Sequence, residues 1–391
     1  MSFIRRYTQL SIMCLLLGCA DDEGPSTFIK VFGGDEHDIG RGIAVAADGE
    51  YIITGSTYAD VNGIKISDIW LLKVTEDGSE RWSRTIGGGD WDHGNSVIQS
   101  SSGNSVLVGY TWSYGSGETD VILRVSNSSG YTQFQKYFGG DSSDRGYGVI
   151  ELTQGGYLLA GSTRSYGSGG SDAWAIKTDN SGNQLWDLAY GGIGDDAAYD
   201  LVESSDSTYL VAGKGNDSGD GGDMMAAMFA DDGSIIWSQT YSGSGDDVAW
   251  AAAKGSDGNF LLAGQTRQSN AGDSDIFLVG INNLGVERWR VITGNTGDDA
   301  AQGAIAISDG EYVVTGYTAN AEGNADLMLM RIDSGGNTVW TNTFDSGMDD
   351  RGYDLAEATG GYVVTGVTNQ TGEELDGDLW VIRTDNNGKS D

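Results

Sequence analysis

The chain has 391 residues, of which 57 are acidic and 22 basic, so its formal net charge is −35 at pH 7. A surface this acidic excludes binding to nucleic-acid phosphates and electrostatic attachment to anionic lipid. Hydrophobic residues make up only 38% of the chain, which is low for one large core and favours a core spread in thin layers.

The N-terminus is predicted to be a processing signal. Two arginines precede an apolar stretch over residues 12–17, which is too short to span a bilayer. Two leucines followed by Gly18-Cys19 then resemble a bacterial lipobox. We expect a signal peptide over residues 1–18 and an acyl chain, such as palmitate, on Cys19; the alternative is an ordinary secretory signal. Cys14 lies in the removed part, so no disulfide is expected.

An acidic tether is predicted over residues 19–26. The run Asp21-Asp22-Glu23 resembles the surface-export signal of lipoproteins in the Bacteroidota, although a solvated spacer would have the same composition. Processing leaves 20 basic residues against 57 acidic ones. We therefore expect a protein of the outer membrane, held by its lipid alone and exposed at the cell surface.

From residue 27 onward, one motif recurs seven times at a spacing of about 52 residues. Each copy contains a Gly-x-Thr-like triplet and, farther on, an aspartate that opens an apolar run. The triplets start at Gly55, Gly109, Gly161, Gly213, Gly264, Gly316 and Gly366, and the aspartates are Asp68, Asp120, Asp172, Asp223, Asp275, Asp326 and Asp378. A strand-built repeat of this length is typical of a β-propeller.

The third repeat shows what each copy contains. Short apolar segments over residues 146–152, 157–163, 172–178 and 184–190 are separated by turns rich in Gly, Asn and Asp, which is the hairpin pattern. No apolar run reaches ten residues without glycine, which argues against helices. Each repeat is therefore predicted to form one blade of four antiparallel strands, A to D.

The ring is predicted to close through its N-terminal strand. An aromatic residue lies near the start of strand D in six repeats: Trp82, Phe134, Trp186, Trp237, Trp289 and Trp340. The seventh repeat ends before this strand, whereas residues 28–34 match its pattern. We expect an all-β, seven-bladed propeller over residues 27–391 that behaves as a monomer, because closure removes exposed sheet edges.

The repeat over residues 136–186 resembles the β-propeller repeat proteins of bacterial and archaeal cell surfaces. It contains Phe-Gly-Gly, Gly-Gly-Tyr, Asp-x-Trp and a final Asp-x-x-Gly-x-x-x-Trp. The last element, Asp179 to Trp186, is also similar to the docking motif of the tryptophan-docked blades of quinoproteins, with one residue fewer between Asp and Gly. The resemblance covers roughly residues 27–391 and implies the propeller fold, without a quinone site.

The two faces of the ring are expected to differ. The D-to-A and B-to-C connections lie on one face, which we call the long-loop face, and the A-to-B and C-to-D turns lie on the other, the tight-turn face. Phe28 begins a D strand and therefore starts at the tight-turn face. About eight residues separate it from Cys19, a reach of at most roughly 28 Å. The tight-turn face is predicted to look toward the membrane.

Acidic residues form two sevenfold sets near the long-loop face. Besides the C-strand aspartates, one aspartate precedes each A strand: Asp38, Asp92, Asp144, Asp196, Asp247, Asp299 and Asp350. These sets predict either a cation-binding rim or acceptors for backbone N–H groups. Asp217, Asp220 and Asp223 in a glycine-rich loop are a candidate calcium site, or part of a flexible polar loop. His37 and His93 are a weak metal signal.

Aromatic residues in the long loops are confined to blades 1 to 3. They are the candidate ligand-binding residues Tyr58, Trp91, Trp112, Tyr114 and Tyr166. The corresponding loops of the other blades carry Lys214, Arg267, Asn320 and Gln370 instead. Exposed aromatics outside the core pattern are typical of binding sites. Trp91 and Trp112 are the strongest candidates, since Tyr114 and Tyr166 share a repeat position that suits loop packing.

These features predict a non-catalytic binding or scaffold module for a protein or a neutral polysaccharide. No Ser-His-Asp order, nucleotide loop or zinc motif stands out. Two alternatives remain open: a propeller-based glycosidase or lyase, and a periplasm-facing factor like the propeller lipoprotein of the outer-membrane barrel-assembly machinery. Fold alone does not separate them.

Overall fold

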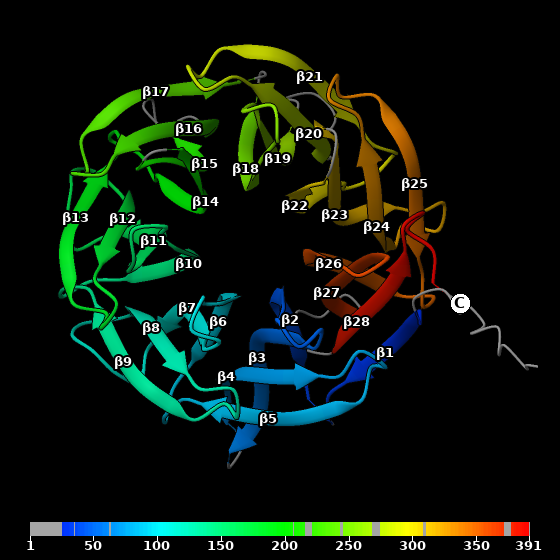
Figure 1. The fold of residues 1–391 in the computed structure, drawn as a ribbon, viewed down its shortest axis with the longest axis horizontal. Coiled ribbons are helices and arrows are strands. Elements are labelled where there is room, and N and C mark those ends of the chain that lie inside the picture. Colours follow the sequence, from blue (N-terminus) through cyan, green and yellow to red (C-terminus); the bar gives the residue numbers. More distant parts are fainter. Residues whose placement is uncertain are drawn as a thin grey trace, which may run out of the picture.

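The computed structural model describes residues 26–34, 36–61, 64–205, 207–215, 221–242, 245–267, 274–307, 310–370 and 377–390. These residues form seven four-stranded antiparallel sheets around a central axis (Figure 1). The molecule is a seven-bladed β-propeller, as the sequence predicts. The predicted signal peptide and Cys19 lie outside the described residues.

Each of the first six blades is built from one continuous segment. From the axis outward, blade 1 consists of β2 (Asp38–Val45), β3 (Tyr51–Val61), β4 (Ile64–Val74) and β5 (Glu80–Ile86), and blade 2 of β6 (Asp92–Gln99), β7 (Ser105–Thr111), β8 (Asp120–Ser126) and β9 (Thr132–Phe138). Blade 3 consists of β10 (Asp144–Glu151), β11 (Tyr157–Thr163), β12 (Asp172–Thr178) and β13 (Gln184–Tyr190), and blade 4 of β14 (Ala197–Ser205), β15 (Thr208–Gly215), β16 (Asp223–Ala230) and β17 (Ile235–Tyr241). Blade 5 consists of β18 (Asp246–Lys254), β19 (Phe260–Arg267), β20 (Ser274–Ile281) and β21 (Glu287–Thr293), and blade 6 of β22 (Ala300–Ala306), β23 (Tyr312–Ala319), β24 (Ala325–Ile332) and β25 (Thr338–Phe344).

The seventh blade joins the two ends of the described chain. It consists of β26 (Asp349–Ala358), β27 (Gly361–Gln370), β28 (Asp378–Asp385) and, outermost, β1 (Phe28–Phe32). In Figure 1 the blue β1 lies beside the red β28, and the register pairs Phe28 with Arg383 and Phe32 with Leu379. The predicted closure is therefore confirmed, and β1 begins at the tight-turn face.

The core is divided into layers between neighbouring blades. One cluster joins Leu210, Met224 and Met228 of blade 4 to Phe260 and Phe277 of blade 5, and equivalent clusters join the other blades. Phe28 belongs to a cluster that contains residues of both blade 1 and blade 7. Because each layer is thin, a chain of low hydrophobic content can still fill its core.

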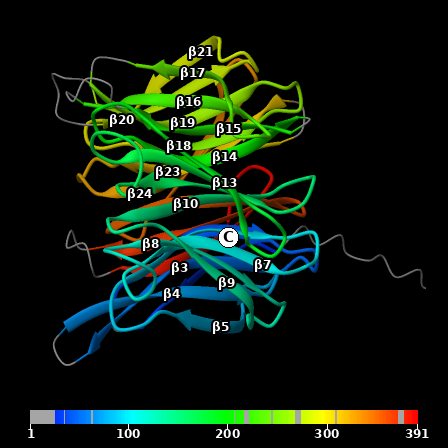
Figure 2. The ribbon, with the colours of Figure 1, turned by 90° about the vertical axis from the view of Figure 1, so that its left-hand side faces the viewer.

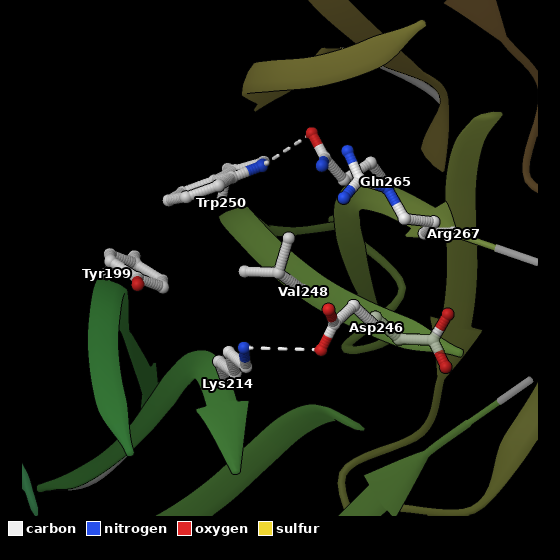
Figure 3. Close-up of a pocket in the computed structure, with 8 residues that line it drawn as sticks. Tyr199, Lys214, Asp246, Val248, Trp250, Gln265 and Arg267 are labelled. Carbon is white, nitrogen blue, oxygen red and sulfur yellow. Dashed lines mark hydrogen bonds and ion pairs between the residues drawn. The ribbon is translucent and has the colours of Figure 1, made fainter. Parts of the chain in front are cut away.

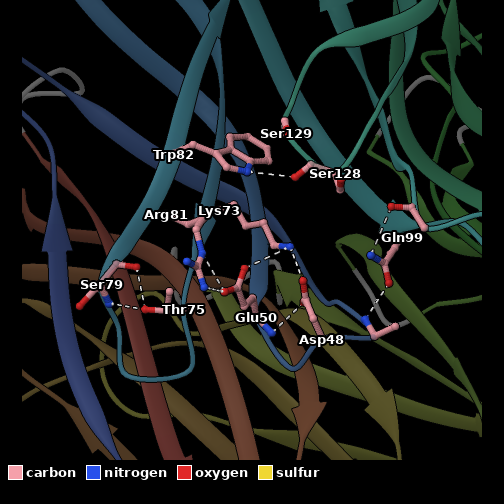
Figure 4. Close-up of polar contacts among 12 residues, drawn as sticks. Asp48, Glu50, Lys73, Thr75, Ser79, Arg81, Trp82, Gln99, Ser128 and Ser129 are labelled. Carbon is pink, nitrogen blue, oxygen red and sulfur yellow. Dashed lines mark hydrogen bonds and ion pairs between the residues drawn. The ribbon is translucent and has the colours of Figure 1, made fainter.

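Four D-strand tryptophans each dock their own blade onto the following one. The indole N–H groups of Trp82, Trp186, Trp237 and Trp289 donate to the carbonyl oxygens of Ser128, Asp231, Asn283 and Ser334, at 2.9–3.1 Å; Figure 4 shows the first of these contacts. The acceptor lies in the C-to-D turn of the following blade. The turn glycine packs on the ring, as Gly233 does on Trp186 with φ +83°, which explains the spacing of glycine and tryptophan in the repeat.

Ion pairs at the tight-turn face hold two cations of blade 1, Lys73 and Arg81. The buried ammonium of Lys73 lies 2.6 Å from Asp48 Oδ2 and 3.1 Å from Glu50 Oε2, and Glu50 also accepts from Arg81 (Figure 4). The hydrogen bond from Arg81 lowers the pKa of the Glu50 carboxyl. Each charge in this group is therefore satisfied within its own blade.

The edge-on view in Figure 2 shows that the blades form a thick ring. The β3–β4 hairpin of blade 1, with 11 residues in each strand, extends farthest at the long-loop side. Among the residues that the structure describes, none belongs to a helix of the length and apolar character needed to cross a membrane.

Candidate functional site

Tyr58, Trp91 and Trp112 gather around the imidazole of His93 at the long-loop face. Ring centroids lie 5.7 Å apart for Tyr58 and Trp91, 6.2 Å for Trp91 and His93, and 6.2 Å for His93 and Trp112. Three of the five predicted ligand-binding residues therefore form one aromatic cluster, which spans blades 1 and 2.

Backbone hydrogen bonds fix the loops that carry these rings. The Trp112 N–H donates to the Trp91 carbonyl at 2.9 Å, and the Tyr58 N–H donates to the His37 carbonyl at 3.0 Å. In both cases the residue after the Gly-x-Thr triplet binds the D-to-A segment of the same blade. The rings are held by secondary structure, so little ordering is needed when a ligand binds.

Two serine hydroxyls of blade 1 hold His93, the residue at the centre of the cluster. Its Nδ1 lies 2.8 Å from Ser56 Oγ and its Nε2 lies 3.4 Å from Ser67 Oγ, so blade 1 contacts both ring nitrogens. Burial, together with the nearby charges of Arg41 and Arg145, lowers the pKa of His93 to about 3. The imidazole is therefore neutral at physiological pH and has a structural role.

Arg145 from blade 3 completes the cluster. Its guanidinium carbon lies 5.2 Å from the ring centroid of Tyr110 and 5.8 Å from that of Trp112, within the range of a cation–π contact. Trp112 is 39% exposed, whereas Tyr58 and Trp91 are half-buried. The cluster thus presents Trp112 to solvent and supports it with an arginine and a histidine that sequence reasoning did not connect to it.

Tyr114 and Tyr166 lie apart from the cluster and pack their own loops. Tyr114 stacks on Tyr137 at 5.7 Å, and its hydroxyl donates to the carbonyl of Gly87 at 2.9 Å. Tyr166 makes the equivalent bond to Gly139 at 3.1 Å. Both rings remain about 45% exposed, so they brace the loops while part of each ring faces solvent.

The sevenfold aspartates that precede the A strands act as hydrogen-bond acceptors. Asp144, for example, accepts from the Gly140 N–H at 2.9 Å, from Ser165 Oγ at 2.6 Å and from the hydroxyl of Thr163, the last residue of the triplet. A side chain at Gly161 would collide with the carbonyl oxygen of Arg145, which explains the glycine of the triplet. Of the two predicted roles, the structure shows the acceptor role.

The candidate calcium site is only partly described. Asp223 is the first residue of β16, while Asp217 and Asp220 lie outside the described residues. Within the described ranges, no group of three or more His, Cys, Asp or Glu side chains is arranged to hold a metal ion.

A ring of side chains narrows the central channel. Each A strand has a β-bulge three residues after the aspartate that recurs at its start. The bulge residues are Arg41, Asn95, Tyr147, Tyr199, Trp250, Gln302 and Tyr353. They line a cavity of about 100 Å³. Sequence reasoning missed this ring, although its fixed distance from the aspartate is a signal that could have found it.

Two channel carboxyls clasp one blade to the next. Asp200 of β14 accepts from the N–H of Ala252 in β18 at 2.8 Å, and Asp354 of β26 accepts from the N–H of Ile43 in β2 at 2.9 Å. Each also accepts from the N–H of the residue that follows it. Burial raises the pKa of Asp200 to about 6 and that of Asp354 to about 7. Their hydrogen bonds give both carboxyls a structural role.

The raised pKa values of Asp200 and Asp354 predict that the free energy of unfolding falls as pH rises. Burial also raises the pKa of Asp120 to about 6, against 3.8 for an ordinary aspartate. The folded chain then binds more protons than the unfolded chain between about pH 4 and pH 7, so stability is lost as pH rises through the folded pKa of each group.

We expect a higher melting temperature at pH 5 than at pH 8, measured by circular dichroism at constant ionic strength. Asp354→Asn should flatten the slope, since the amide does not titrate and retains one acceptor. A melting temperature that rises between these two pH values contradicts the prediction.

No family model matches the chain, and no curated protein matches it in sequence. The fold is similar to that of the WD40 domain of Pan2 from Neurospora crassa, with a TM-score of 0.52 and 10% identity over 94% of this chain and 98% of that one. A protein of unknown function from Dyadobacter fermentans (TM-score 0.49, 9% identity, 92% and 98% covered) and Sqt1 from Chaetomium thermophilum (TM-score 0.49, 12% identity, 88% and 82% covered) also match. At 10% identity, the likeness to Pan2 establishes a WD40-like propeller fold and nothing about the ligand.

Proposed function

We propose that this protein is a non-catalytic binding module of the outer membrane, anchored by a lipid on Cys19, whose long-loop face binds a protein or a neutral polysaccharide. The observation that carries the proposal is the cluster of Tyr58, Trp91 and Trp112 around His93. Exposed aromatic rings on a preorganised support are the usual centres of binding energy in interfaces.

The polar groups of the cluster and of the channel support binding rather than catalysis. His93 is neutral and contacts two serine hydroxyls, and Asp144, Asp200 and Asp354 accept backbone hydrogen bonds. A general acid or base needs a proton position that faces the substrate. These groups instead hold loops and neighbouring blades in place.

Charge and orientation narrow the partner. The net charge of −35 disfavours acidic polymers, which leaves a protein or a neutral polysaccharide. β1 enters the ring at the tight-turn face, and the short tether to Cys19 turns that face toward the membrane. The aromatic cluster then looks away from the membrane, toward its partner.

Replacing both tryptophans, Trp91→Ala with Trp112→Ala, is expected to weaken partner capture by at least about thirtyfold, which corresponds to about 2 kcal/mol. Capture is measured on a glycan array and by pull-down from surface extract. The melting temperature should fall only modestly, because Trp112 is 39% exposed.

Tyr131→Ala is the matched control for this pair. Tyr131 is 62% exposed and lies in the C-to-D segment of blade 2, at the opposite face. It should leave capture unchanged. A folded double variant that captures its partner like the natural chain would overturn the proposed site.

The anchor is tested separately in cells. Cys19→Ser should release the protein from the membrane fraction. Replacing Asp21-Asp22-Glu23 by alanines should reduce the protease-accessible fraction on intact cells while total membrane-bound protein stays constant. Unchanged surface exposure after the second change would reduce this run to a spacer.

A further inference from the structure

A second cavity opens between blades 4 and 5, close to the long-loop face. It encloses about 200 Å³, several times the roughly 30 Å³ that one water molecule occupies in the liquid. Its lining residues are Tyr199, Lys214, Asp246, Asp247, Val248, Trp250, Gln265 and Arg267. None of them belongs to the aromatic cluster of blades 1 and 2.

The repeat explains why a cavity can form here. At the interface of blades 2 and 3, Arg145 lies over Tyr110, and at the interface of blades 6 and 7, Arg351 lies over Tyr317 at 4.7 Å. The same two repeat positions are Val248 and Lys214 at the interface of blades 4 and 5. Valine is short, and Lys214 is turned toward Asp246 Oδ1 at 3.5 Å, so the space between the blades stays open.

One wall of the cavity is apolar and rigid. The rings of Tyr199 and Trp250 lie 4.5 Å apart between centroids, and Val248 lies beside them (Figure 3). The indole N–H of Trp250 donates to Gln265 Oε1 at 3.3 Å, which fixes the orientation of the ring. Both rings also line the channel cavity, so they form the wall between the two spaces.

Positively and negatively charged side chains both line the rim of the cavity. Asp246 Oδ1 accepts from the Gly222 N–H at 2.7 Å, and this bond lowers the pKa of Asp246 and keeps it ionised. Lys214 and Arg267 supply positive charge. In the described part of the chain, no residue accepts a hydrogen bond from the Arg267 guanidinium. Lys214 thus lies beside the carboxylate of Asp246, and Arg267 adds a second positive charge to the rim.

We propose that this cavity binds one neutral pyranose unit. A pyranose has a face of C–H groups that suits the rings of Trp250 and Tyr199, and a girdle of hydroxyls that can both donate and accept at Gln265, Asp246 and Arg267. Such a mixture of an apolar wall with a few polar groups is typical of small-molecule sites. The inference goes beyond the proposed function and does not depend on it, since the two sites share no residue.

Other ligand classes fit the cavity less well. An apolar ligand would cover the polar rim of Lys214, Asp246 and Gln265 without offering it a hydrogen bond, which is unfavourable. An anionic ligand would meet the carboxylates of Asp246 and Asp247 in a chain with a net charge of −35. A neutral polyhydroxylated ring satisfies both the wall and the rim.

The test is a binding assay of the full mature chain against D-glucose, D-galactose, D-mannose and N-acetyl-D-glucosamine, with D-glucuronate and glycerol as comparison probes. Saturation-transfer NMR reports contact, and tryptophan fluorescence gives the affinity. At least one neutral hexose is expected to bind, with its C–H protons receiving the transfer. Absence of binding by all four, or binding of glucuronate alone, overturns the proposal.

Variants locate the bound sugar. Trp250→Ala should weaken binding of the responding sugar at least about tenfold, and Arg267→Ala, which changes an exposed side chain, should weaken it severalfold without affecting the fold. Unchanged affinity in both variants overturns the assignment to this cavity. The Trp91→Ala/Trp112→Ala variant should keep the sugar affinity, whereas Trp250→Ala should keep partner capture, so failure of either site is seen separately.

Discussion

Deleting residues 27–34 is expected to unfold the ring at temperatures where the natural chain is folded. The deletion removes β1, whose five residues pair with Leu379 to Arg383, and exposes the edge of β28. It also removes Phe28 from the core layer between blades 7 and 1. Loss of a buried phenylalanine alone costs about 3–5 kcal/mol, and the lost strand pairing adds to it. A fall in melting temperature of more than about 10 °C should appear by calorimetry.

Two controls separate closure from simple truncation. Deleting residues 20–24 should leave the melting temperature unchanged. Moving residues 27–34 to the C-terminal end, where the other six blades carry their D strand, should restore most of the lost stability. If the first deletion melts at the same temperature as the natural chain, closure by β1 is unimportant for stability.

Trp186→Ala is expected to destabilise the protein by about 3–5 kcal/mol, as large-to-small changes of aromatic residues usually do. Trp186 packs on the core layer between blades 3 and 4, donates to the Asp231 carbonyl at 2.9 Å and supports Gly233 of the next blade. Its loss leaves a gap and removes this hydrogen bond at a single interface. The free energy of unfolding is measured with guanidinium chloride.

Trp186→Phe is the matched variant, because blade 2 has Phe134 at this position, packed against Gly182. The phenyl ring keeps the packing and loses only the hydrogen bond, so a cost of about 1 kcal/mol is expected. If the alanine variant loses no more stability than the phenylalanine variant, the tryptophan does not dock the blades.

The fold could be predicted because every blade requires the same types of residue at the same positions. Glycine is required where strand B approaches the bulge of strand A, as Gly161 shows, and an aromatic is required where a turn glycine packs, as Trp186 shows. Such needs recur at the same spacing, so the period was visible in the sequence. The match of Phe28 to this pattern also revealed the closure.

The candidate sites could be predicted only in part. Tyr58, Trp91 and Trp112 lie next to the motif, so their position on the long-loop face followed from topology. That they meet around His93 depends on contacts between two blades, which a repeat-by-repeat comparison does not reveal. Tyr114 and Tyr166 also lie on the long-loop face, but their hydroxyls donate to the carbonyls of Gly87 and Gly139 in the neighbouring loops.

The cavity between blades 4 and 5 was missed for a related reason. The sequence pattern assigns Lys214 and Arg267 to loops without aromatics, whereas both are strand residues, of β15 and β19. The aromatic wall comes instead from Tyr199 and Trp250 in the A strands. A bulge breaks the two-residue alternation of a strand, so alternation alone does not indicate that these rings face inward.

The pairing of β1 with β28 also determines the order in which the molecule can be completed during synthesis. β1 is the first of the described strands to leave the ribosome, and its partner β28 is the last of them. Blades 1 to 6 can fold as they emerge, since each is one continuous segment. Until the last strand is made, β1 is a free strand that could complete the seventh blade of another copy, as in domain swapping. Synthesis of β28 therefore sets the moment at which the ring can close on itself and can no longer exchange β1 with another copy.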